Sequence, residues 1–336
     1  MTLQQLRCIV AVSRQRLNIT AAARALYMTQ PGVSRHVRMF EDEIGVRVFS
    51  RSGPSLSHVT TAGKAIIEQA EQILHASQHL QDLGRSLSDP TSGTLAIGTT
   101  HTQARYILPD VISRFVGRYP KVSLQLHQGT PQQVAAMADE GLINMVIATE
   151  AIERHESLVA LPCYSWDYAV ILPCDHPLAR QGQLDLQMLS QYPIITYIEG
   201  FTGRATIDQA FAAEEIVPNI TVTAADADII KTYVRNGIGI GIVANMAYDP
   251  EVDADLCVMD GAGLFPSSTT RLGIRRDAIL RRFDLDFIEY FAPHLRCELV
   301  ERAVGEKSQA AVDALFTSVP HYAPRLASFS PSLATA

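Results

Sequence analysis

Four polar side chains near the start of the chain have a chemistry and a spacing that suit contact with a groove of DNA. They are Gln30, Ser34, Arg35 and Arg38. Amide and guanidinium groups pair with base edges and phosphates in the major groove. Just before them, Thr29 is placed to cap a helix, and Pro31 suits its first turn, where a missing N–H costs nothing. The pattern predicts a helix that lies in DNA, with these six residues at its contact surface.

A helical hairpin is expected to position these side chains. Tyr27 and Met28 form the turn, and small residues on the first helix let the second helix cross it closely. The small residues are Ala21, Ala22 and Ala25. Apolar residues on the second helix recur at i, i+4, i+7 and i+11, which predicts one buried stripe. The stripe is Val33, Val37, Phe40 and Ile44. An ordinary surface hairpin is the alternative, but the turn, the cap, the stripe and the basic face all favour a helix-turn-helix.

Two further features extend the DNA-reading interpretation. Residues 46–59 predict two short strands around a Ser-Gly-Pro turn, which form a wing, and Arg51 on it is placed to contact backbone phosphates. Residues 1–60 contain eight arginines, no lysine and three acids, so their net charge is +5. The whole chain carries −7, which leaves −12 for the rest. A basic end on an acidic body indicates a nucleic-acid module joined to a different kind of domain.

A long helix is predicted from about Thr60 to Leu87, and it carries an apolar seam at spacings of three and four residues. The seam is Ile66, Ile67, Ala70, Ile73, Leu74, Ser77, Leu80 and Leu87. A helix outside a globular core must bury such a seam, and pairing with the same helix of a second subunit is the expected solution. Two copies also suit DNA reading, because a dimer reads two half-sites.

From Thr94 onward, short β-branched runs alternate with helical stretches, which is typical of βα units on largely parallel sheets. We predict an α/β body of two lobes with a cleft between them. The expected domains are a winged helix-turn-helix over 1–59, a linker and dimerisation helix over 60–90, an effector domain over 91–303, and a mobile tail over 304–336. Lobe I is expected over about 91–164 and 266–303, and lobe II over about 165–265.

Hydroxyl-bearing side chains cluster where predicted strands end and helices begin. Ligands bind at such ends in parallel α/β domains, because free N–H groups and positive helix termini face the same edge. The residues predicted to bind a small anion are Thr100, Thr102, Gln103, Thr149, Thr202, Gly203 and Arg204. Gly129–Pro131 is a further candidate. The alternative is that these threonines only cap helices. Trp166 lines the cleft or the hinge, or it packs in the core, and core packing is the favoured interpretation.

Composition and motifs disfavour several other classes. The chain has 336 residues, 47 % hydrophobic and 19 % charged, which is typical of a globular protein of two or three domains. No signal-peptide pattern is visible, and no apolar run approaches the ~20 residues that cross a bilayer, so we expect a cytoplasmic protein without membrane partners. Five scattered cysteines without a C-x-x-C pair argue against a metal site. Without a P-loop, a G-x-S-x-G or an H-E-x-x-H motif, we expect neither an enzyme nor a resident cofactor.

Three groups of residues together resemble the LysR-type transcriptional regulators. They are the block TAAARALYMTQPGVSRHVRMFEDEIGVRVFSR, the T-x-A-G start of the linker helix, and the two-lobed body. Within that family the chain is similar to the cysteine-regulon, sulfur-assimilation branch. The segments that carry this similarity are TTHTQARYILP, VSLQLHQGTP, IATEAI, LPCYSW, ITYIEGFTGRATID, ADADIIKTYVRNGIGIGI and FAPHL. The resemblance covers about residues 1–300.

The resemblance implies an effector domain folded like a periplasmic binding protein, with an anion site near the residues predicted above. It implies an activator that assembles as a homotetramer, a dimer of dimers, on promoter DNA. The effector would be a small anion such as sulfate, or O-acetylserine or N-acetylserine. We hypothesise that effector binding shifts the two lobes, and that this changes the DNA bend and the contact with RNA polymerase. The motifs do not separate control of cysteine biosynthesis from alkanesulfonate use.

Three other interpretations stay open at the level of the sequence. A solute-binding protein for uptake needs an export signal and does not explain the basic N-terminus. A thiol-based redox regulator would use Cys163 and Cys174, although two small core or strand-end residues are the favoured interpretation of this pair. A LysR-type regulator of aromatic catabolism would bind carboxylate inducers instead of sulfate.

Overall fold

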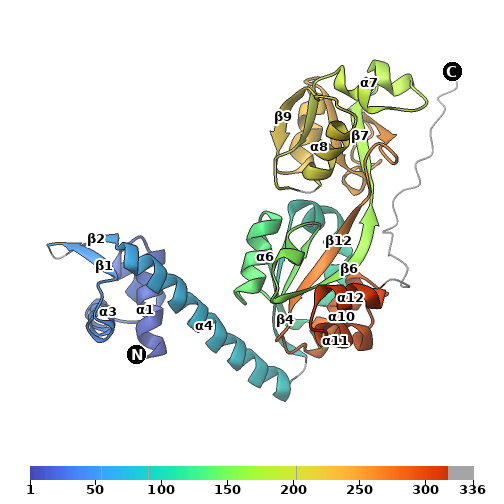
Figure 1. The fold of residues 1–336 in the computed structure, drawn as a ribbon. Coiled ribbons are helices and arrows are strands. Elements are labelled where there is room, and N and C mark those ends of the chain that lie inside the picture. The colour runs from blue at the N-terminus through green and yellow to red at the C-terminus, as the bar shows by residue number, and fades with distance from the viewer. Residues whose placement is uncertain (54, 90, 202, 317–336) are drawn as a thin grey trace. The chain divides into compact units, whose positions relative to one another are not determined.

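The computed structural model describes residues 1–53, 55–89, 91–201 and 203–316 of the chain. It divides into two compact units, Met1–Ser88 and Asp89–Ala336. Each unit has its own hydrophobic core, and each is described by itself below (Figure 1). The candidate DNA-contact residues lie in the first unit and the candidate effector-binding residues lie in the second.

The first unit is a three-helix core with a two-stranded wing and a long helix. Its elements are α1 (Leu3–Arg14), α2 (Ile19–Ala25), α3 (Gln30–Ile44), β1 (Phe49–Ser52), β2 (Ser55–Val59) and α4 (Thr61–Ser88). Side-chain oxygens begin the helices: Asn18 accepts from Ala21 N at 2.9 Å, and Thr29 accepts from Gly32 N at 3.3 Å. Gly45 ends α3 in the left-handed conformation, with φ of 75°, which a side chain would disfavour.

The predicted apolar stripe of α3 is correct except at its last member. Val33, Val37 and Phe40 are buried, but Ile44 is 40 % exposed and is the last residue of the helix. Glu41 is buried instead. Its carboxylate accepts from Val48 N at 2.8 Å and from Phe49 N at 3.0 Å, and so it fastens the start of the wing to the recognition helix.

The second unit is a two-lobed α/β body, as predicted. Lobe I contains the sheet β4-β3-β5-β12-β6 and lobe II contains the sheet β11-β7-β10-β8-β9 (Figure 1). The elements that precede the crossover between lobes are β3 (Ser92–Thr99), a π-helical turn η1 (Gln103–Ile107), α5 (Leu108–Arg118), β4 (Lys121–Gln128), α6 (Pro131–Asp139), β5 (Met145–Ala148), η2 (Ile152–Arg154) and β6 (Leu158–Trp166).

The chain enters lobe II after Asp167 and returns to lobe I through residues 261–267. The elements of lobe II are β7 (Tyr168–Pro173), η3 (Pro177–Arg180), α7 (Leu186–Ser190), β8 (Ile194–Tyr197), α8 (Arg204–Ala213), β9 (Ile220–Ala224), α9 (Ala227–Arg235), β10 (Ile240–Ala244), η4 (Asn245–Ala247) and β11 (Leu256–Asp260). Lobe I is completed by β12 (Ser268–Arg275), α10 (Arg282–Phe291), α11 (Cys297–Val304) and α12 (Gln309–Phe316).

The sheets are less parallel than the sequence pattern predicts. Each has a parallel core of three strands, β4-β3-β5 or β9-β8-β10, to which two strands add in antiparallel fashion. The sequence pattern missed β6 and β11. The run over β6 is buried on both faces, so it lacks the alternation that marks a half-exposed strand, and it contains Pro162.

The prediction of a mobile tail over 304–336 is wrong for residues 309–316. These residues form α12, which packs on β6 and buries Val312 and Phe316. The Gln309 side chain joins the backbone of Ala160 in both directions, at 3.0 Å to its N–H and 2.8 Å to its carbonyl. Residues 317–336 lie outside the described part of the chain. Among the described residues, no helix is long and apolar enough to cross a membrane.

Candidate functional site

The predicted DNA-contact residues form one open face of α3. Gln30, Arg35 and Arg38 are exposed and Ser34 is half-buried. The opposite face of the helix is buried in the core of the first unit, so the polar face is directed to solvent. Exposed guanidinium and amide groups on a rigid helix are available to a groove without any rearrangement of the core.

The wing and the capping residues extend this face. Arg51 is exposed on β1, which pairs with β2 in antiparallel register. Thr29 caps α3 and Pro31 occupies its first turn, as the sequence predicts. The structure therefore brings all seven predicted residues into one unit, and their contact with DNA stays a prediction.

The long helix α4 changes character along its length. Its first turns bury Ile67 and Ala70 against the core of the first unit. Farther along, Ile73 is 40 % exposed and Leu80 is 70 % exposed. These two apolar side chains lie seven residues apart, which places them on the same stripe of the helix. In the described part of the chain, Ile73 is only partly covered and Leu80 is largely exposed.

The predicted effector residues of lobe I meet at the carboxyl ends of neighbouring strands. Parallel pairing of β3 with β5 sets Thr99 beside Ile147, so Thr100 and Thr149 follow adjacent strands. Thr100 is 3 % exposed and Thr102 is 1 % exposed. The Thr102 hydroxyl is buried beside the Tyr197 hydroxyl, and no described residue meets it in good hydrogen-bond geometry. By contrast, Thr130 in the fourth candidate segment is a helix cap that accepts from Gln133 N at 3.1 Å.

The side chain of Gln103 is held by hydrogen bonds. The amide donates to Thr270 Oγ1 at 3.2 Å and accepts from the Tyr164 hydroxyl. Both ends of the side chain therefore have partners in lobe I, and the amide nitrogen also lies 3.9 Å from Met246 Sδ of lobe II. Ala104 N at the start of η1 donates to the Thr100 carbonyl at 3.1 Å. The N–H groups that precede it belong to the first turn, where amides commonly lack a carbonyl partner within the helix.

Lobe II contributes the N-terminus of α8. Gly203 is the residue before this helix, with φ of 72°, and a Cβ there would overlap the Tyr168 hydroxyl. The Arg204 guanidinium group already has partners within lobe II. Its Nε donates to Asp208 at 2.8 Å and its Nη1 donates to the Tyr197 carbonyl at 2.7 Å. Thr202 lies outside the described residues. The effector roles of these three residues stay predictions.

Glu150 is a residue of this site that the sequence analysis missed. It follows Thr149 in lobe I, and its Oε1 accepts from Gly203 N of lobe II at 2.6 Å. Its Oε2 is buried and has no hydrogen-bond partner among the described residues. Burial raises the pKa of the Glu150 carboxyl, and the Gly203 N–H and the charge of Arg154 only partly oppose this. The only available signal was an acidic residue directly after the hydroxyl at a strand end.

The crossover between the lobes is an aromatic cluster beside Gly203. Trp166 is 2 % exposed, which confirms core packing for this residue, and its ring centroid lies 5.0 Å from that of Tyr168. The Tyr168 hydroxyl donates to the Gly203 carbonyl at 3.0 Å and meets Ser268 Oγ at 2.9 Å. The α8 N-terminus is therefore held from both sides, by Tyr168 and by Glu150.

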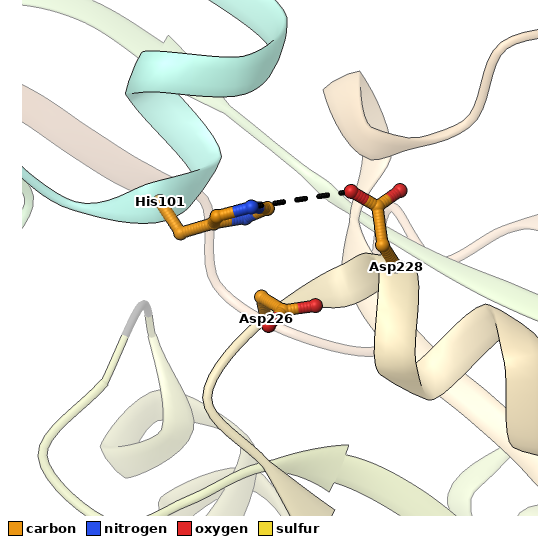
Figure 2. Close-up of side chains that lie close together, drawn as sticks. All are labelled: His101, Asp226 and Asp228. Atoms are coloured by element: carbon orange, nitrogen blue, oxygen red, sulfur yellow. Dashed lines mark ion pairs between the residues drawn. The ribbon is translucent and has the colours of Figure 1, made fainter.

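A second contact between the lobes joins His101 to Asp226 and Asp228 (Figure 2). One ligand-type atom from each lies within 4.8 Å of the others, and His101 Nε2 is 4.0 Å from Asp228 Oδ2. However, Asp228 already accepts from the Tyr106 hydroxyl at 2.8 Å and pairs with Lys231 at 3.4 Å. Because these partners compensate the carboxylate, we interpret the group as an ion-pair network between the lobes and not as a metal centre.

The structure does not bring the two cysteines of the redox alternative together. Cys163 lies in β6 of lobe I, with its thiol at the Leu161 carbonyl, whereas Cys174 follows β7 of lobe II, with its thiol at the Asp255 carbonyl. Burial raises the pKa of the Cys163 thiol, which disfavours the reactive thiolate.

A helix-turn-helix unit joined to a two-lobed binding unit defines a ligand-responsive DNA-binding regulator. Two family models match the chain: "Bacterial regulatory helix-turn-helix protein, lysR family" over residues 3–64 and "LysR substrate binding domain" over residues 88–296. The chain belongs to the LysR family of transcriptional regulators. It is a regulator and not an enzyme.

Three similar proteins refine this assignment. The HTH-type transcriptional regulator SsuR of Burkholderia cenocepacia is 48 % identical over 88 % of this chain and 96 % of its own length. The HTH-type transcriptional regulator CysB of Haemophilus influenzae is 44 % identical over 95 % of this chain and 98 % of its own. The crystal structure of the cofactor-binding domain of the Cbl transcriptional regulator is 41 % identical, covers 64 % of this chain and 95 % of that chain, and gives a TM-score of 0.62. The predicted similarity to the sulfur-assimilation branch is confirmed.

Proposed function

We propose that this regulator controls sulfur-assimilation promoters in response to a small anion or an acetylated serine bound between its lobes. The observation that carries the effector site is the convergence of buried hydroxyls from lobe I with the α8 N-terminus of lobe II. Thr100 and Thr102 are almost fully buried, and they lie where β3 ends and the next helical segment begins, a position at which first-turn amides face a ligand. Hydroxyls and helix N-termini are suited to bind a small anion without a charged side chain.

On the DNA side, we propose that Gln30, Ser34, Arg35 and Arg38 read or clamp the major groove while Arg51 binds phosphate. The exposed stripe of α4 at Ile73 and Leu80 supports pairing of two chains through this helix. We propose that two such pairs form a tetramer on one promoter in the cytoplasm and activate transcription through contact with RNA polymerase.

The coupling follows from the geometry of the binding unit. The candidate site takes residues from both lobes, so a ligand that contacts both favours one arrangement of the lobes over the others. A ligand shifts such an equilibrium only by its difference in affinity between the two states. The change in lobe arrangement would then alter how the paired DNA-reading units are spaced.

The effector site is tested by calorimetric titration of sulfate, O-acetylserine and N-acetylserine. Thr100→Ala and Thr102→Ala should each weaken an anion about tenfold or more, since a hydrogen bond to a charged group contributes ~1.5–3 kcal/mol. The matched control is Thr223→Ala, because Thr223 is exposed on β9. Equal affinity in all four proteins for every anion would reject the site. Binding of aromatic carboxylates alone would instead support the catabolic alternative.

The DNA site is tested by fluorescence anisotropy with a promoter fragment. Arg35→Ala should weaken specific binding by about 1–3 kcal/mol, which is roughly tenfold or more. Arg180→Ala removes the same charge from an exposed position of the second unit and should leave affinity unchanged. An Arg35→Ala protein that binds as tightly as the control would contradict the recognition-helix assignment.

A further inference from the structure

Glu150 presents an unusual arrangement for an anion site. One carboxylate oxygen, Oε1, already accepts a hydrogen bond from Gly203 N at the α8 N-terminus, at 2.6 Å. The other oxygen is buried, and it has no hydrogen-bond partner among the described residues. A carboxylate thus sits at the helix end where the sequence predicted the effector anion.

We propose that Glu150 selects the effector: it favours an anion that also carries an N–H or ammonium donor, as an amino-acid-like zwitterion does, over an inorganic dianion. The proposal rests on the effector site proposed above and names the chemical class that this site takes. A donor group of the ligand would satisfy the buried Oε2, while the negative group of the ligand is bound by the hydroxyls of Thr100 and Thr102.

The need for a ligand donor follows from the desolvation of Glu150. Leaving a buried acceptor without a partner is costly, and more so when it is charged. Its surroundings supply little compensation: Arg154 acts on it only through its charge, and the Arg204 guanidinium is held by Asp208 and the Tyr197 carbonyl. A ligand ammonium or N–H is the group that completes this site.

The bias against a dianion follows from the same charge. Two like charges a few ångströms apart in a partly desolvated cleft repel each other strongly, because little water screens them. Sulfate bound by Thr100 and Thr102 has no donor with which to offset this repulsion. An amino-acid-like ligand replaces repulsion by attraction at the same position.

Glu150 also links the two lobes, since it follows β5 of lobe I and binds the backbone of lobe II. A donor that approaches Oε2 leaves the bond from Gly203 to Oε1 intact. A zwitterionic ligand can therefore bind while the lobes stay joined at this point.

The test uses the full-length protein and three probes in calorimetric titrations. The probes are O-acetylserine, sulfate and 3-acetoxypropanoate, which has the carboxylate and ester of O-acetylserine but no ammonium group. In the wild-type protein, O-acetylserine should bind at least tenfold more tightly than either of the others. In Glu150→Gln, which keeps an acceptor for Gly203 N, sulfate should gain about tenfold and O-acetylserine should lose about tenfold.

The control variant is Glu140→Gln, which removes the same charge at an exposed position of lobe I and should change no ratio. If Glu150→Gln binds all three probes with the same affinity ratios as the wild-type protein, the role of Glu150 is rejected and the anion site is retained. Equal wild-type affinity for O-acetylserine and 3-acetoxypropanoate does the same, independently of how the variant folds. If the wild-type protein binds none of the three, both the anion site and the role of Glu150 are rejected.

Discussion

The two candidate binding surfaces of this chain use polar side chains in opposite ways. On α3, Gln30, Arg35 and Arg38 are exposed, and the core lies on the other face of the helix. In the candidate effector site, Thr100 and Thr102 are almost fully buried. Solvated charges attract a polyanion from a distance and are screened by salt, whereas buried hydroxyls act only on a ligand that replaces their water. The first surface is suited to affinity for DNA, and the second to discrimination among small molecules.

The largest expected effect that separates the two surfaces is their response to salt. If the paired protein neutralises about six or more phosphates, DNA affinity should fall ~10³-fold between 50 and 200 mM salt. Effector affinity should change by less than about tenfold, because its contacts are short and partly desolvated. Anisotropy with promoter DNA and calorimetry with the effector, across one salt series, measure both slopes. If DNA affinity and effector affinity fell equally steeply with salt, the two surfaces would not differ in the way described.

The next largest effect concerns a buried ion pair that supports lobe II. Lys231 donates to Asp253 at 2.8 Å and to the Ala247 carbonyl at 2.9 Å, and both charged side chains are buried. Burial alone would raise the pKa of Asp253, but hydrogen bonds, the one from Lys231 first among them, hold it below its ordinary value. Lys231→Met should therefore destabilise the binding unit by about 3 kcal/mol.

Differential scanning calorimetry at neutral pH measures this loss. Lys307→Met is the matched control, because Lys307 is exposed in the same unit. The first unit has its own core, so its transition should stay in place in Lys231→Met. A variant as stable as the control would mean that the desolvation of the pair offsets its attraction.

A smaller effect is expected at the backbone of the cleft. Gly203→Ala places a Cβ on the Tyr168 hydroxyl at a positive φ, and such overpacking typically costs about 1–3 kcal/mol. The α8 N-terminus would shift, so effector affinity should fall while DNA affinity without effector stays unchanged. Gly182→Ala is the control, since a Cβ there meets nothing within 4 Å. An effect on DNA binding alone would contradict the assignment of this helix end to the effector.

The DNA-reading surface was largely predictable because its signals are local. A cap at Thr29, a proline in the first turn and the spacing of Val33, Val37 and Phe40 all lie within one helix. Ile44 was misassigned because it is the last residue of α3, and whether another element covers a helix end is a tertiary property. Glu41 was unexpected for the same reason, since its partners Val48 and Phe49 lie beyond the helix.

The cleft was predictable only in part because its contacts are distant in sequence. The hydroxyls at strand ends could be expected from the βα pattern, and adjacency of β3 and β5 brings Thr100 near Thr149. The bond from Gly203 to Glu150 joins residues 53 positions apart, and no local pattern indicates it. Likewise, α12 was missed because the burial of its two apolar residues requires β6, which was itself not predicted.

The smallest expected effect tests whether Glu150 is held in the cleft at a cost to stability. Its pKa is raised in the folded protein, so the folded state binds a proton more tightly than the unfolded chain does. At a pH below the unfolded pKa both states carry the proton and nothing is lost. As pH rises through the unfolded and then the folded pKa, the wild-type protein loses stability, whereas Glu150→Gln has no such titration.

The variant should therefore melt at a higher temperature than the wild-type protein at pH 7.5 and should match it at pH 4. Paired melting curves at the two pH values give the difference directly, and Glu140→Gln should show the same small shift at both. A Glu150→Gln protein that is less stable than wild type at pH 7.5 would mean that the Gly203 bond outweighs desolvation. In that case Glu150 would be a structural bridge between the lobes, and its unpaired oxygen would not mark a place for a ligand donor.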